Sequence, residues 1–213
     1  MIGSMVMQSV IQEKANRIVE VLLSSVKSKE LMMGKIFGAA ITGVIQMAIW
    51  LSPVILVIST TWFALPKEMT FNITLGQIGY LLINFFIGLL TFVGLFATVG
   101  SIFEDPQDAQ SGMWPVLLLI MIPFLIAMAM MQNPENQIAK IASMFPFAAI
   151  IVMPTRMTLM DVPTWQVVVS FFVNIGTVLL LFPVAGKIYR VGILMTGKKP
   201  KWSEVVKWFK YKY

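Results

Sequence analysis

Long apolar stretches, separated by short polar segments, dominate the pattern of this chain. A helix needs about 20 residues to cross the roughly 30 Å hydrocarbon core of a bilayer. Stretches of about that length occupy residues 36–63, 78–103, 114–131 and 165–188. The pattern therefore predicts an all-α integral membrane protein with about four transmembrane helices.

A further apolar stretch, residues 138–153, differs from these because Pro146 interrupts it. A proline in a helix interior removes a backbone hydrogen bond and kinks the helix. The stretch is also too short to cross a bilayer as one straight helix. We expect it to form a re-entrant helical hairpin on the outer side of the bundle.

The chain opens with an apolar run, residues 1–12, which is too short to span and lacks the basic start and cleavage site of a signal peptide. We expect this run to be the last turns of a longer helix.

The next segment, residues 13–25, is amphipathic at the helical period and is expected to lie along the membrane surface. One face carries Ile11, Ala15, Ile18, Leu22 and Val26, and the other carries Glu13, Arg17, Glu20 and Ser24. The charged face is a candidate docking surface for a soluble partner.

Basic residues gather before the first predicted span and after the last one. Of the 16 Lys and Arg residues, only Lys67, Lys140 and Arg156 lie between these two groups. Cytoplasmic loops of membrane proteins are enriched in Lys and Arg, so we expect both ends of this chain in the cytoplasm. The same bias accounts for the net charge of +6 without any nucleic-acid partner.

Composition agrees with the membrane assignment. With 58% hydrophobic residues, 12% charged residues and a mean hydropathy of +0.83, the chain has too little polar surface to coat a soluble globule.

After the last span, the segment 191–213 is rich in lysine and places Trp202, Val205, Val206 and Phe209 on one helical face. We expect an amphipathic tail helix on the anionic inner leaflet of the bilayer.

Few side chains in this sequence are suited to catalysis, metal binding or polar contact with a substrate. The chain has no Cys and no His, which removes thiolate zinc sites, Cys nucleophiles and the commonest general base. We predict no catalytic residue and no metal site. Gln46, Asn84 and Asn174 are polar side chains inside predicted spans, and each is either an interhelical hydrogen bond or a contact to a transported substrate.

Three carboxylates, Glu104, Asp105 and Asp108, follow the second predicted span without a basic neighbour in sequence. Carboxylate clusters bind calcium or magnesium in some proteins, but the EF-hand spacing is absent here. We interpret the cluster as a solvated second cytoplasmic loop.

Four blocks of the sequence, in this order, resemble the membrane subunit of type-2 ATP-binding-cassette (ABC) transporters. They are EKANRIVEVLLSSVKSKELMMGKIFG (13–38), GSIFEDPQDAQ (100–110), MFPFAAIIVMPTRM (144–157) and KIYRVGILMTGKKP (187–200). In particular, the chain is similar to the C-terminal half of the NatB-like permeases, which are named for sodium efflux. Members of that family usually have an earlier span and a large outer domain upstream, so the resemblance predicts that this chain is a piece of a longer permease.

The resemblance also implies a partner. In that family an intracellular coupling helix docks on a cytoplasmic ATPase subunit, and the matching residues here are Glu13, Lys14, Arg17 and Glu20. The predicted organisation is then a truncated span and coupling helix in residues 1–34, a transmembrane domain in 35–190 and a cytoplasmic basic tail in 191–213. Two permease copies, as a homodimer or a heterodimer, are expected to rock when the ATPase subunits close.

The chain itself has no GxxxxGK[ST] loop that could hold phosphates. ATP and Mg²⁺ are therefore expected in the partner subunit only, and this chain is not expected to be an enzyme. It is predicted to be the permease of an exporter in the cell (inner) membrane.

Two other function classes stay open. An ion-coupled secondary transporter commonly uses buried Asp, Glu or His, and the predicted spans carry almost none. A membrane anchor or assembly protein without transport is also compatible with the sequence. Within the transporter interpretation, sodium, a drug, a peptide and a lipid are all compatible substrates.

Overall fold

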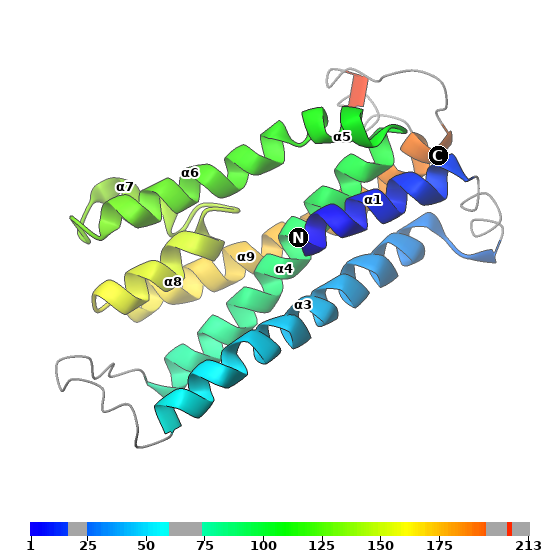
Figure 1. Cartoon of the computed structure of the whole chain (residues 1–213). Helices are drawn as coiled ribbons and strands as arrows, with labels where there is room; N and C mark the ends of the chain where they lie inside the picture. Colours follow the sequence, from blue (N-terminus) through cyan, green and yellow to red (C-terminus); the bar gives the residue numbers. More distant parts are fainter. Residues whose placement is uncertain (17–24, 60–73, 195–203, 206–213) are drawn as a thin grey trace.

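The computed structural model describes residues 1–16, 25–59, 74–194 and 204–205. Every regular element within these ranges is helical, which confirms the predicted all-α class (Figure 1). The helices are α1 (Ile2–Ala15), α3 (Ser28–Ser59), α4 (Leu75–Ile102), α5 (Pro106–Gly112), α6 (Trp114–Met130), α7 (Gln137–Ala142), α8 (Ala149–Leu159) and α9 (Thr164–Leu194).

Three of the described helices are long and apolar enough to cross a bilayer. These stretches are Ser28–Pro53 in α3, Gly76–Ile102 in α4 and Thr164–Gly192 in α9. The pair of α5 and α6 is a fourth candidate, bent by 41° at the junction. The described part of the chain thus holds three to four candidate spans, in agreement with the predicted number.

The bend between α5 and α6 follows from local sequence. The Asp105 carboxylate accepts a hydrogen bond from the Gln107 N–H at 2.8 Å and caps α5, and Pro106 follows in the first turn. Met113 then separates α5 from α6, and Pro115 lies in the first turn of α6. Proline is tolerated there because a first-turn amide has no partner within the helix.

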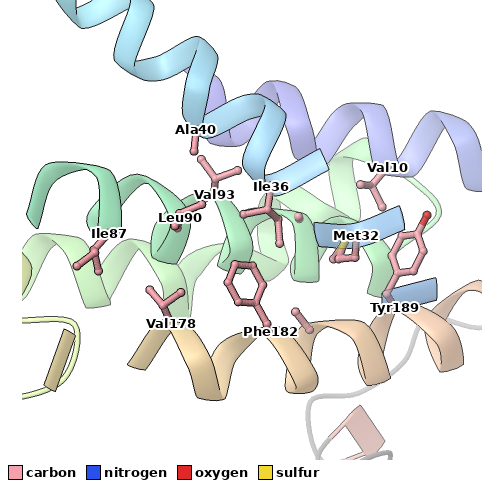
Figure 2. Close-up of a cluster of buried hydrophobic side chains, with 12 residues drawn as sticks. Val10, Met32, Ile36, Ala40, Ile87, Leu90, Val93, Val178, Phe182 and Tyr189 are labelled. Atoms are coloured by element: carbon pink, nitrogen blue, oxygen red, sulfur yellow. The ribbon is translucent and has the colours of Figure 1, made fainter. Parts of the chain in front are cut away.

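Helix α4 lies at the centre of the bundle and packs against α1, α3, α8 and α9. Figure 2 shows the main apolar cluster between these helices. It includes Val10 of α1, Met32, Ile36 and Ala40 of α3, Ile87, Leu90 and Val93 of α4, and Val178, Phe182 and Tyr189 of α9. Phe37 of α3 stacks on Phe182 of α9 with the ring centroids 5.7 Å apart. Because lipid tails are themselves apolar, these contacts stabilise the bundle through van der Waals packing.

Two glycines allow the closest helix contacts. A Cβ atom at Gly100 of α4 would lie 2.6 Å from the carbonyl oxygen of Met7 in α1. A Cβ atom at Gly192 of α9 would lie 2.3 Å from the carbonyl oxygen of Ser101 in α4. Both contacts are to backbone atoms, which cannot move aside as a flexible side chain can. They fix α1 and α9 against one end of α4, which we call the basic end because Lys14, Lys35 and Lys187 lie on the helices that meet there.

The stretch around Pro146 forms two short helices, α7 and α8, joined by a turn in which Phe147 has a φ of 65°. Arg156 of α8 is buried and holds this unit together. Its Nη1 donates to Ser143 Oγ at 2.7 Å and to Gln166 Oε1 at 2.9 Å, so it links the end of α7 to the start of α9. The helix break lies where the sequence predicted it, but insertion of the hairpin into the bilayer from the outer side stays a prediction.

Most of the predicted tail helix lies outside the described residues. Of its four apolar positions, only Val205 is described, and it packs with Ile102, Ile188 and Val191 near the end of α9. The position of the tail on the inner leaflet and the domain boundaries at residues 34 and 190 stay predictions.

We expect Gly192→Ala to lower the thermal unfolding temperature of the detergent-solubilised protein, because the new Cβ would meet the Ser101 carbonyl. Overpacking of this kind costs about 1–3 kcal/mol. Gly176→Ala in the same helix is the matched control, since nothing lies within 4 Å of its Cβ position. A helix-interior Gly→Ala change stabilises by about 0.5–1 kcal/mol when space is free. Equal unfolding temperatures for the two variants would contradict the close contact at Gly192.

Candidate functional site

A cavity of about 760 Å³ lies between the start of α1 and helices α3, α4 and α8. Most of its wall is apolar and comes from α4, including Leu81, Phe85, Leu89 and Phe92. Ligand sites in proteins commonly have volumes of about 300–1,000 Å³. The cavity is therefore large enough for a small organic molecule.

The two polar side chains in this wall are Gln46 of α3 and Asn84 of α4. Both were predicted from the sequence as candidate path residues, and the structure brings them to one cavity. Within the described residues, the Gln46 amide has no hydrogen-bond partner. It is therefore free to donate to, or accept from, a molecule in the cavity.

The third predicted path residue, Asn174 of α9, holds Asn84 in place. Its Nδ2 donates to Asn84 Oδ1 at 2.7 Å, and Asn84 Nδ2 donates to the carbonyl oxygen of Ile150 at 2.9 Å. These bonds connect α9, α4 and α8 in a buried network. Asn174 does not line the cavity. The pair of asparagines therefore makes an interhelical hydrogen bond, and a role of either residue in substrate contact stays a prediction.

Among the residues that the structure describes, no Asp, Glu, Lys or Arg side chain lines the cavity. Within the described chain, α4 and α6 also lack these residues along their whole length. An ion without counter-charge or water is very costly to place in such an environment. The chemistry of the cavity therefore favours binding of an uncharged, mostly apolar molecule with a hydrogen-bonding group.

The predicted docking residues fall into two groups. Arg17 and Glu20 lie outside the described residues, so the structure says nothing of them. Glu13 and Lys14, by contrast, make contacts inside the fold. Glu13 forms an ion pair with Lys35 of α3. Lys14 is 6% exposed, and its Nζ lies 3.9 Å from Glu104 Oε1 and donates to the Ser101 carbonyl at 3.5 Å.

Burial also changes the pKa of Lys14. It lowers the pKa of the ammonium from its usual 10.5, and the nearby Glu104 carboxylate offsets this effect only in part. The family resemblance, and not the helical pattern, placed Lys14 among the docking residues. The contact with α4 is a tertiary feature, and the local sequence gave no signal for it.

The three acidic residues after α4 have separate roles. Glu104 pairs with Lys14, Asp105 caps α5, and Asp108 lies in the first turn of α5, where a negative charge is favourable. Among the described residues, no group of three His, Cys, Asp or Glu side chains is placed to hold a metal ion.

One family model matches most of the chain, and two curated relatives align with nearly all of it. The family model described as ABC-2 family transporter protein matches residues 1–187. Uncharacterized protein MJ1024 of Methanocaldococcus jannaschii is 29% identical over 208 residues, which is 97% of this chain and 49% of that protein. Uncharacterized protein YhaP of Bacillus subtilis is 26% identical over 211 residues, which is 96% of this chain and 50% of that protein. The chain thus spans about half the length of these curated relatives. No solved structure matches it significantly.

The asparagine pair can be tested by a double-mutant cycle. Asn84→Ala and Asn174→Ala should each lower the free energy of unfolding. The double variant should lose less free energy than the sum of the two single losses, because each single variant already removes the shared hydrogen bond. Interhelical hydrogen bonds in membrane proteins contribute about 0.6 kcal/mol on average and up to about 1.7 kcal/mol. The measurement is the free energy of unfolding in mixed micelles. Strict additivity of the two changes would mean that the side chains do not interact. Thr42→Ala, an exposed hydroxyl that bonds within its own helix, is the control.

Proposed function

The chain belongs to the ABC-2 family of transporter proteins, and from this premise we propose that it is the permease of an ABC exporter that moves an uncharged, largely apolar substrate. Members of the family are non-catalytic membrane components that partner with cytoplasmic ATPase subunits and form dimers. Under this proposal, ATP and Mg²⁺ bind to the ATPase subunit. Because the chain spans about half of its curated relatives, the activity of the whole protein is part of the proposal.

The observation that carries the proposal is the cavity beside α4. It combines a volume suited to a small molecule, a wall in which the described residues include no Asp, Glu, Lys or Arg, and the Gln46 amide, which has no hydrogen-bond partner among them. A substrate in this position would contact α3, α4 and α8. The asparagine network joins α4 and α8 to α9, and Arg156 joins α8 to α9. Relative movement of these helices would open or close the cavity, as expected for a transporter that alternates between two states.

The proposed orientation follows from charge. Lysines and arginines gather at the basic end of the bundle and in the segments next to it, so we place this end in the cytoplasm. The segment after α1, which contains Arg17 and Glu20, then faces the ATPase subunit. It joins α1 to α3, and movement of the ATPase could therefore act directly on both helices.

Sodium efflux is the less favoured substrate assignment. A sodium ion entering this cavity would lose hydration in a wall with no carboxylate and few oxygen ligands. An ion-coupled secondary transporter is disfavoured for the same reason, since α4 and α6 carry no Asp, Glu, Lys or Arg. A membrane anchor without transport does not require a cavity of this kind.

Docking of the ATPase is tested by reversing two charges together, Arg17→Glu with Glu20→Lys. If these residues contact the ATPase, we expect loss of at least about tenfold in co-purified ATPase subunit, which corresponds to about 1.4 kcal/mol. Lys140→Glu, an exposed charge at the opposite end of the bundle, is the control. An unchanged complex with an unchanged ATPase rate would contradict docking at this segment.

The substrate class is tested with inside-out vesicles that contain the permease and its ATPase subunit. We expect ATP-dependent uptake of an uncharged fluorescent amphiphile, with no ATP-dependent uptake of radioactive sodium. Gln46→Leu should raise the KM for a hydrogen-bonding probe about fivefold, because a typical hydrogen bond contributes about 1 kcal/mol.

Two controls separate the alternatives in this assay. Ser52→Ala removes a polar group from an exposed position of the same helix and should leave the KM unchanged. An ionophore should not stop uptake by an ATP-driven transporter. Uptake that follows an ion gradient without ATP would support the secondary transporter, and ATP-driven sodium uptake alone would overturn the apolar substrate class.

A further inference from the structure

Two neighbouring residues at the end of α1 attach this helix to two different spans. Glu13 pairs with Lys35 of α3, and Lys14 contacts Glu104 and the Ser101 carbonyl at the end of α4. Consecutive residues on an α-helix point about 100° apart. For this reason one turn of α1 can reach both neighbours at once, with opposite charges.

Except for Glu104, whose side chain is 39% exposed, the charged groups of these contacts are largely shielded from water. The side chain of Lys14 is 2% exposed, and those of Glu13 and Lys35 are 24% and 17% exposed. Ion pairs in such surroundings are screened far less than surface pairs. The charges of Glu13 and Lys14 are thus used inside the fold. Turning them outward to meet an ATPase would break the contacts that attach α1 to α3 and α4.

A third span reaches the same place through Tyr189 of α9. Tyr189 is fully buried, and its hydroxyl has no hydrogen-bond partner among the described residues. Val10, three residues before Glu13 in α1, lies in the same apolar cluster as Tyr189. Figure 2 shows the hydroxyl pointing from α9 toward α1. A buried hydroxyl without a partner is unfavourable, and a nearby carboxylate is the acceptor that would satisfy it.

We propose that Glu13 and Lys14 are positioning residues that transmit movement of the segment after α1 to α3 and α4, and that the Tyr189 hydroxyl donates to Glu13 when the Glu13–Lys35 pair opens. This inference rests on the proposed function, because it assumes that an ATPase moves that segment. Residues 13 and 14 lie immediately before the segment. Rotation or withdrawal of α1 would therefore pull on the Glu13–Lys35 and Lys14–Glu104 ion pairs. If Glu13 exchanges Lys35 for Tyr189, it has a partner in each of the two states.

The ion pair is tested by charge reversal in the complex of the full chain with its ATPase, reconstituted in proteoliposomes. Glu13→Lys and Lys35→Glu should each leave co-purification of the ATPase intact but lower substrate moved per ATP hydrolysed about tenfold, or about 1.4 kcal/mol in coupling. The combined reversal, Glu13→Lys with Lys35→Glu, should recover most of the coupling, because the pair is rebuilt with opposite polarity.

The outcomes of this experiment are distinct. A combined variant no better than either single variant would overturn transmission through this pair. Loss of ATPase co-purification in the single variants, as expected for the Arg17 and Glu20 reversal, would make Glu13 a docking residue and would overturn the inference while leaving the proposed function in place. Absence of ATP-dependent transport by the wild-type complex would overturn the proposed function and the inference with it.

Tyr189→Phe tests the exchange of partners without placing a new charge in the bundle. Because none of the described residues bonds to the hydroxyl in this state, the variant should unfold at the same temperature as the wild type or at a higher one. Its coupled transport should nevertheless fall several-fold, since the second state loses a hydrogen bond to a carboxylate, and hydrogen bonds to charged groups are among the stronger ones.

Tyr80→Phe is the matched control. The Tyr80 hydroxyl already bonds to Ser170 Oγ at 3.1 Å, so its removal should affect stability and leave coupling unchanged. Wild-type coupling in Tyr189→Phe would overturn the proposed exchange of partners. A lower unfolding temperature in Tyr189→Phe would also count against it, because it would show that the hydroxyl is already satisfied in this state.

Discussion

The close approach of three backbones near the end of α4 is the constraint on which the rest of the structure depends. Gly100 brings the α1 backbone against α4, and Gly192 brings the α9 backbone against the Ser101 carbonyl of α4. In a bilayer, apolar side chains gain little by leaving lipid for another helix, so helix association relies on close packing and on polar contacts. Small residues permit both here, because the carbonyl that meets Gly192 also accepts a hydrogen bond from Lys14. The apolar cluster in Figure 2 forms between helices whose separation is set at this point.

Two polar systems lie at different heights along α4. The asparagine network joins it to α8 and α9 beside the cavity, and the contacts of Lys14 join it to α1 at the basic end. Between them, α4 carries no Asp, Glu, Lys or Arg. Because helices are stiff, α4 moves as a rigid body, and a displacement of one end also displaces the other end. Helix α1, which leads into the proposed docking segment, and the proposed substrate cavity thus both contact α4, which is a simple physical route for coupling in an ABC-2 family protein.

The candidate site residues show which kinds of inference the sequence supported. Gln46, Asn84 and Asn174 were found because a polar amide in an apolar span is conspicuous in any sequence. Their separate roles were not predictable. Gln46 and Asn84 both line the cavity, and Asn174 bonds to Asn84 from another helix, 90 residues further along the chain. Helical period placed Glu13 on a charged face, and the family resemblance added Lys14 to the docking residues. In the structure, Glu13 contacts α3 and Lys14 contacts the end of α4. Tyr189 and Lys35 gave no functional signal, because a tyrosine or a lysine near a span end is common in membrane proteins.

By itself, the sequence determined the all-helical membrane class, the approximate number of spans and the helix break near Pro146. These features depend on local hydrophobicity and on proline geometry, which act over a few turns of chain. The capping of α5 by Asp105 is equally local. Only the tertiary structure decided which helices touch, where a cavity remains and which charges are used internally. Those outcomes depend on contacts between residues far apart in the chain, such as Glu13 with Lys35, Lys14 with Glu104 and Asn84 with Asn174, and no period or motif along a single helix specifies the partner on another.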